Sequence, residues 1–192
     1  MALIDLEDVW KCFRVRRDIV EAVRGLHLQV AEGEMFGFLG PNGAGKSTTV
    51  RILATLLKPD QGRASVAGFD LANQAAQVRI RIGYVGQSRG IGDGATGRAH
   101  LLFQAHAYGS SGASARQRAQ ELIKQFTMEA FVDRPIRTYS GGQYRRLHLA
   151  LGIVHRPKIL FLDEPSLGLV PRAGPISGMK CADCIRWERL CS

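Results

Sequence analysis

A glycine-rich stretch near the first quarter of the chain has the residue types needed to hold phosphate groups. Its residues are Gly40, Pro41, Asn42, Gly43, Ala44, Gly45, Lys46, Ser47 and Thr48. This phosphate loop fits the pattern G-x-x-x-x-G-K-[ST]. Glycines let the backbone fold closely around an anion, so that successive N–H groups point into one concavity. Lys46 is placed to reach the β- and γ-phosphates, and the Ser47 hydroxyl to ligate Mg²⁺. We therefore predict that the chain binds a nucleoside triphosphate.

The elements on either side of the loop support this prediction. The apolar run Met35–Leu39 precedes it and predicts a strand, while Val50 and Leu53 follow at helical spacing. A helix that begins at about Lys46 adds the positive end of its dipole to the site. Strand, glycine loop and helix together are the context in which this motif is specific, and a chance glycine turn lacks both neighbours.

An acidic pair follows a second apolar run. Residues Lys158–Leu162 predict a buried parallel strand, and Asp163 and Glu164 come directly after it. Doubly wound folds place ligand chemistry at the carboxyl ends of such strands. Asp163 suits a role in holding Mg²⁺, and Glu164 suits polarising an attacking water. Taken alone, such a pair is more often a solvated turn; the phosphate loop in the same chain favours the functional interpretation.

A second helix start has the features of an anion site. The stretch Ser140-Gly141-Gly142-Gln143, here the signature loop, precedes apolar residues at helical spacing up to His155. Ser140 is placed to cap the helix, and the two glycines expose backbone donors at its entrance.

The remaining patterns predict an α/β fold with a parallel sheet. Alternating residues over the first 33 positions predict an antiparallel β edge with a hairpin tip at Arg14–Asp18. Ile82–Gln87 predicts a strand that ends in a polar residue. Helical periodicity from about Arg98 to Phe131 predicts a helical insertion that spans about 93–138 between two α/β portions.

Composition sets modest bounds. The chain has 192 residues, 45% hydrophobic and 22% charged, and a formal charge of +9, as expected for a globular domain. The basic balance is compatible with phosphate ligands, an anionic membrane face or nucleic acid, but no base-reading motif accompanies it, so we expect no specific nucleic acid partner. We recognise no signal peptide and no run of about 20 apolar residues. A cytoplasmic location is expected.

These elements in this order resemble the ATP-binding subunits of ABC transporters. The resemblance is carried by the phosphate loop, Gln87, the signature loop and the Leu160–Pro165 stretch, with Phe13 upstream. It covers about residues 3–169, and we assign residues 1–170 to the ATP-binding domain. The detail of the motifs is most similar to the bacterial drug-resistance exporters of the daunorubicin type. The implied fold is a phosphate-loop NTPase core with a parallel sheet, an antiparallel edge and a helical insertion.

The resemblance also implies roles and partners. Phe13 would stack on the adenine of ATP, although Trp10 competes for this role. Gln87 would contact the Mg²⁺ site and couple it to the helical insertion. Ser140, Gly141, Gly142 and Gln143 would contact nucleotide held by a second copy of the domain. The permease would be a separate integral membrane protein, with this chain at its cytoplasmic face.

The end of the chain departs from the family. Val170 stands where the family has an aspartate, and no histidine follows Asp163 to serve as the family's switch histidine. Residues 171–192 resemble nothing in the family, and a shifted reading frame can spell the helix and strand expected there. We therefore expect a carboxyl-terminal truncation, a poorly ordered tail, and cysteines in that tail that ligate no metal.

The resulting interpretation is an exporter subunit that hydrolyses ATP, with activity impaired by the missing end. Two alternatives stay open. One is a nucleotide-binding fragment without productive turnover, which a phosphate-release assay distinguishes. The other is a DNA-associated ATPase with the same cassette, whose long coiled-coil or zinc insertions are not recognisable in this sequence.

Overall fold

An antiparallel sheet forms one side of the molecule. The computed structural model describes residues 2–86, 92 and 94–163. The sheet has the order β2-β1-β3-β4. Its strands are β1 (Ala2–Val15), β2 (Asp18–Ala31), β3 (Gln61–Val66) and β4 (Phe69–Asp70). The predicted antiparallel edge and its hairpin tip are thereby confirmed.

Local backbone geometry keeps the apolar side chains of β1 on one face. Ile4 and Leu6 are buried in alternation, and a register shift then puts Val9 rather than Asp8 into the core. Asp8 has φ 50°, the left-handed conformation that a bulge of this kind requires. Without the shift, Asp8 would be turned towards the core.

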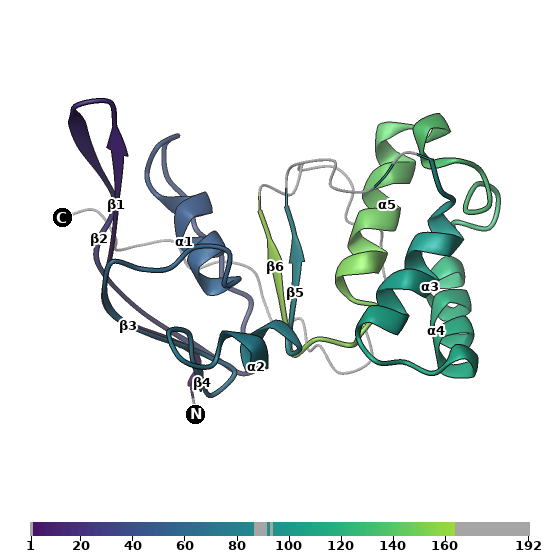
Figure 1. Cartoon of the computed structure of the whole chain (residues 1–192), viewed down its shortest axis with the longest axis horizontal. Coiled ribbons are helices and arrows are strands. Elements are labelled where there is room, and N and C mark those ends of the chain that lie inside the picture. Colours follow the sequence, from purple (N-terminus) through teal and green to yellow (C-terminus); the bar gives the residue numbers. More distant parts are fainter. Residues whose placement is uncertain (1, 87–91, 93, 164–192) are drawn as a thin grey trace.

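A parallel strand pair lies at the centre of the molecule (Figure 1). It consists of β5 (Ile82–Val85) and β6 (Ile159–Leu162), paired in register from Ile82–Ile159 to Val85–Leu162. The parallel sheet expected at Lys158–Leu162 is confirmed, and its partner is the strand that was predicted to begin at Ile82. Asp163 follows β6 directly, and its backbone N–H still donates to the Val85 carbonyl at 3.0 Å.

The prediction of a strand at Met35–Leu39 was wrong. These residues adopt no regular secondary structure, and Met35 and Leu39 are 75% and 65% exposed. A strand needs neighbours that complete its hydrogen bonds. Within the described residues, β5 and β6 make up the parallel sheet, and neither pairs with this run. Its apolar pattern therefore has no sheet to join.

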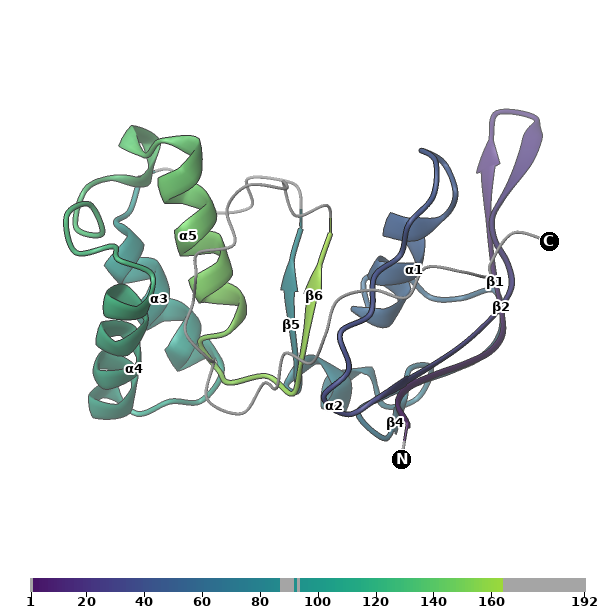
Figure 2. The same cartoon turned by 180° about the vertical axis from the view of Figure 1, so that it is seen from behind.

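The helices divide between the two sides of the parallel pair. Their bounds are α1 (Lys46–Leu53), α2 (Ala75–Arg79), α3 (Gly97–Ala107), α4 (Gly112–Gln125) and α5 (Gly141–Gly152), with a 3₁₀ turn η1 (Ile136–Thr138). Both views place α1 and the antiparallel sheet on one side of β5 and β6, and α3–α5 on the other (Figures 1 and 2). The helical segments predicted within about 93–138 and after the signature loop are present. Sequence patterns did not predict α2.

Two hydrophobic clusters correspond to these two sides. One joins buried residues of the antiparallel sheet, α1 and the parallel strands, including Leu6, Ile52 and Phe161. The other joins α3, α4 and α5 through residues such as Leu101 and Leu147. No helix in the described part of the chain is both long and apolar enough to cross a membrane.

Candidate functional site

The phosphate loop turns through three glycines with positive φ. Gly40, Gly43 and Gly45 have φ angles of 149°, 87° and 80°. At Gly45, a Cβ would also lie 2.1 Å from the Ala22 carbonyl oxygen. Glycine is therefore required at position 45 by backbone conformation and by the close approach of β2. The same contact places the start of α1 against the antiparallel sheet.

Lys46 is folded back over this loop. Its ammonium group donates to the carbonyl oxygens of Gly40 and Pro41, both at 2.7 Å. The first turn of α1 is stabilised by Thr49, whose hydroxyl donates to the Gly45 carbonyl at 3.0 Å. Ser47 and Thr48 lie half-buried at the helix start, next to the loop. The predicted phosphate-binding residues are thus brought together, with the cationic group and the helix N-terminus at one place.

Asp163 is the buried carboxylate of the site. Its side chain is 2% exposed and accepts a hydrogen bond of 3.1 Å from the Tyr84 hydroxyl on β5. Arg51 on α1 lies 3.8 Å away, from Nε to Oδ2. Burial, and then the negative charge of Asp163, raise the pKa of Tyr84, so this hydroxyl stays protonated and continues to donate. A buried carboxylate of this kind needs such partners.

The donor set fits Mg²⁺ bound with a triphosphate. The Asp163 carboxylate and the Ser47 hydroxyl are the hard oxygen ligands that this ion prefers. When bound, the ion neutralises charge on the phosphate oxygens. Gln87, the other predicted metal ligand, and Glu164, the predicted water-polarising acid, lie outside the described residues.

Sequence reasoning missed the two partners of Asp163. Arg51 lies four residues after Ser47 on α1, and Tyr84 lies on the strand that pairs with β6. Helical spacing alone places Arg51 on the same face as Ser47, and this was an available signal. The register of β5 against β6 is a long-range feature that no local pattern reveals.

The signature loop begins α5 as a capping box. The Gln143 backbone N–H donates to the Ser140 hydroxyl at 3.3 Å, and the Ser140 N–H donates to the Gln143 side-chain oxygen at 3.0 Å. Arg134 donates to the same Gln143 oxygen at 3.2 Å. The predicted cap at Ser140 is confirmed. Gly141 is exposed, and no atom apart from its chain neighbours and the backbone of α5 lies within 4 Å of where its Cβ would be, which leaves space beside its backbone.

The two helix starts predicted to bind anions lie far apart in the fold. The signature loop begins α5 and the phosphate loop begins α1, on opposite sides of β5 and β6 (Figures 1 and 2). The chain therefore does not bring the two loops to one phosphate by itself. Any site that uses both needs a second molecule.

Phe13 lies near the tip of the β1–β2 hairpin. It pairs with Val20, and the Lys11 ammonium lies 5.6 Å from its ring centroid. Trp10, the competing aromatic, donates from its indole N–H to Asp8 at 2.9 Å and lies against Gly25. Phe13 is the less constrained of the two rings.

The sequence profile of the ABC transporter family matches residues 23–167. The chain belongs to the ABC transporter family. The match runs from β2 to beyond β6 and includes both loops. It confirms the family and the α/β fold expected from the motifs.

Several relatives within the ABC transporter family are drug-resistance proteins. The chain is 51% identical over 152 residues to the daunorubicin/doxorubicin resistance ATP-binding protein DrrA of Streptomyces peucetius, covering 79% of this chain and 46% of the relative. It is 36% identical over 168 residues to the ABC transporter ATP-binding protein NatA of Bacillus subtilis, covering 87% and 68%. The chain thus spans less than half of the drug-resistance relative.

Solved ABC structures share the fold. The ATP-binding cassette MJ0796, in a dimeric post-hydrolysis state bound to ADP and phosphate, matches with a TM-score of 0.79 and 27% identity, covering 86% of this chain and 75% of that one. A second dimeric structure of that cassette matches with a TM-score of 0.76, covering 83% and 72%.

Proposed function

We propose that this chain binds MgATP at the phosphate loop as the ATP-binding subunit of an exporter. The observation that carries the proposal is the geometry of Gly40–Lys46, where left-handed glycines and a cation converge on the N-terminus of α1. When nucleotide binds, the Lys46 ammonium group gives up its hydrogen bonds to two carbonyl oxygens and donates to the phosphates instead, which are charged and therefore stronger acceptors. Asp163 and Ser47 hold Mg²⁺, and Phe13 stacks on the adenine.

The remaining roles follow from the separation of the two loops. A second copy presents Ser140, Gly141, Gly142 and Gln143 to the γ-phosphate, so that ATP is enclosed between two subunits. Glu164 polarises the attacking water, and Gln87 links the metal site to the helical insertion within residues 1–170. The dimeric state of the solved relatives supports this arrangement.

The partner of the dimer is a separate integral membrane permease at the cytoplasmic face of the membrane. The names of the drug-resistance relatives support export as the coupled process. ATP hydrolysis to ADP and phosphate is the reaction, slowed here by Val170, which stands where the family has an aspartate.

Equilibrium titration with MgATP tests the proposal. Replacing Lys46 by alanine removes a charged contact to phosphate and is expected to weaken binding about ten- to a hundredfold. Lys124→Ala is the matched control, because Lys124 is exposed on α4, away from the loop. Equal affinities for the wild-type chain and Lys46→Ala would rule out this site.

A further inference from the structure

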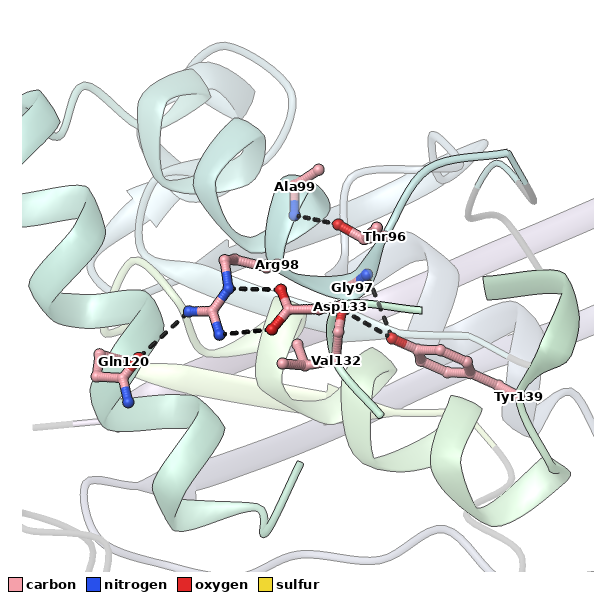
Figure 3. Close-up of polar contacts among 8 residues, drawn as sticks. All are labelled: Thr96, Gly97, Arg98, Ala99, Gln120, Val132, Asp133 and Tyr139. Atoms are coloured by element: carbon pink, nitrogen blue, oxygen red, sulfur yellow. Dashed lines mark hydrogen bonds and ion pairs between the residues drawn. The ribbon is translucent and has the colours of Figure 1, made fainter. Parts of the chain in front are cut away.

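One tyrosine hydroxyl joins the residue before the signature loop to the N-terminus of α3. Tyr139 is 8% exposed, and its hydroxyl accepts from the Gly97 N–H at 3.3 Å and donates to the Val132 carbonyl at 3.1 Å. Figure 3 shows both bonds meeting at this hydroxyl. The Val132 carbonyl also accepts from the Arg98 N–H at 3.1 Å. Three segments are therefore joined at one buried point.

The approach of Tyr139 to α3 is too close for any side chain at position 97. A Cβ on Gly97 would lie 2.6 Å from the Tyr139 hydroxyl oxygen and 3.3 Å from Leu147 of α5. The φ of Gly97 does not require glycine, since it lies outside the positive range. Glycine is present here because of the tyrosine.

Charged and backbone contacts hold the same segments together. Arg98 donates from two nitrogens to both carboxylate oxygens of Asp133, at 2.7 and 2.9 Å, and from a third to Gln120 of α4 at 3.2 Å (Figure 3). Arg98 holds the pKa of Asp133 below its usual value, so the pair stays charged at neutral pH. Thr96 forms a β-bridge with Pro135.

Tyr139 differs from the residues of these other contacts because it lies next to the signature loop in the sequence. Ser140 follows directly and begins the capping box, so a change at the Tyr139 ring is passed along a single peptide unit. The ring itself packs edge-on against Phe131, with centroids 5.0 Å apart. Packing holds the ring in the core, whereas the hydroxyl fixes where the following residue lies relative to α3.

We propose that Tyr139 is a positioning residue that makes the signature loop and the N-terminus of α3 one rigid unit. Its hydroxyl, held by Gly97 and Val132, keeps Ser140 and Gly141 where a second copy can present its γ-phosphate. The inference rests on the proposed function, because the loop acts on nucleotide held by another subunit. Tyr139 itself touches no nucleotide.

The test compares Tyr139→Phe with Phe131→Leu. Tyr139→Phe keeps the ring contact with Phe131 and removes the two hydroxyl bonds, whereas Phe131→Leu keeps the hydroxyl bonds and removes the ring contact. Sedimentation velocity in MgATP measures self-association, and titration at dilution measures ATP affinity. Tyr139→Phe is expected to weaken MgATP-driven association about tenfold and to leave ATP affinity unchanged. Phe131→Leu, compared at similar thermal stability, is expected to associate like the wild-type chain.

A double-mutant cycle sharpens the result. Gly97→Ala forces the Tyr139 hydroxyl away and is expected to impair association at least as much as Tyr139→Phe. In the Tyr139→Phe background the same substitution is expected to cost clearly less, since the oxygen that it would strike is gone. Additive losses would contradict the proposed contact. Association of Tyr139→Phe equal to that of the wild type would overturn the proposal.

Amide exchange separates failure of this inference from failure of the proposed function. If the wild-type chain does not associate in MgATP, the dimer arrangement is wrong, and exchange on the chain alone then decides the role of Tyr139. The Gln143 amide, which donates to Ser140, is expected to exchange about tenfold faster in Tyr139→Phe than in Phe131→Leu. Equal exchange in the two variants would refute the positioning role.

Discussion

The two loops predicted to hold phosphate are supported in different ways. The signature loop is held by side chains: Ser140 and Gln143 cap each other, Arg134 joins them, and Tyr139 ties the loop to α3. The phosphate loop begins a helix whose N-cap, Gly45, has no side chain to contribute. Its conformation depends on glycine backbone angles and on contact with β2.

The segments that precede the two loops differ as well. The signature loop follows residues packed in the helical cluster, whereas the phosphate loop follows the exposed run Met35–Leu39. Exposed apolar side chains of this size favour association with another apolar surface. The signature loop is therefore positioned by side chains of this chain, whereas fewer contacts among the described residues support the phosphate loop.

The largest expected effect concerns the reaction that needs both loops. Val170 stands where the family has an aspartate, and its side chain cannot make that polar contact across a dimer. Loss of one preorganised group of this kind costs roughly 10²–10³ in rate. We expect steady-state turnover well below about 1 s⁻¹, the lower end of ordinary enzymes.

A phosphate-release assay at saturating MgATP measures this turnover. Glu164→Gln is the matched variant, because it keeps the shape of the side chain and removes its charge, and it should lower any remaining rate further. Turnover of the wild-type chain at or above about 1 s⁻¹ would falsify the expectation and show that one chain supplies more of the site than its motifs indicate.

Two glycines of the phosphate loop provide the next test. Gly45 and Gly43 have similar positive φ angles, but a Cβ strikes the Ala22 carbonyl only at Gly45; nothing lies within 4 Å at Gly43. Gly43→Ala is expected to cost roughly 1–2 kcal/mol from backbone strain alone. Gly45→Ala is expected to cost about 3 kcal/mol or more in free energy of unfolding. Urea titration of both variants checks the difference, and equal losses would mean that contact with β2 does not support the loop.

The smallest expected effect is a pH dependence on the helical side. His155 stacks on Tyr108 with ring centroids 3.8 Å apart and donates from Nε2 to the Ile82 carbonyl at 2.8 Å. Burial lowers its pKa below the ordinary value of 6.5. As the pH falls, this histidine is therefore protonated in the unfolded chain before it is protonated in the folded chain. Its contribution to the free energy of unfolding is complete at neutral pH and is lost as the pH falls below about 6.5.

Urea midpoints at several pH values measure this dependence. One proton contributes at most about 1.4 kcal/mol per pH unit. His155→Gln should flatten the curve between pH 5 and 7, and His148, whose pKa is also lowered by burial, should account for part of what remains. An unchanged slope in His155→Gln would mean that this histidine is not held neutral by the fold.

The sequence predicted local features well and long-range features poorly. The cap at Ser140 and the start of α1 at Lys46 depend on neighbouring residues, so their patterns were sufficient. The Met35–Leu39 run also reads as a strand, but a strand depends on partners elsewhere in the chain. Tyr84 was missed for the same reason, since its contact with Asp163 exists only once β5 and β6 pair.

The site residues divide along the same line. The phosphate-loop residues could be predicted from the sequence because one contiguous motif contains all of them. Helical spacing places Arg51 on the same face as Ser47, but its contact with Asp163 joins segments that lie far apart in the sequence. The need for glycine at position 97 is a feature of the folded structure, in which a Cβ there would lie 2.6 Å from the Tyr139 hydroxyl oxygen.

Mixing two defective variants tests the central claim that one ATP is enclosed by two different loops from two copies. Lys46→Ala weakens ATP binding about ten- to a hundredfold, so that little nucleotide is bound at a limiting MgATP concentration. Ser140→Arg blocks the signature loop while its own phosphate loop stays intact. Sedimentation velocity in MgATP is predicted to show that neither variant associates alone. Their equimolar mixture is predicted to form a heterodimer with one bound ATP. Association of either variant alone to the wild-type extent, or no association in the mixture when the wild-type chain dimerises, would contradict the account.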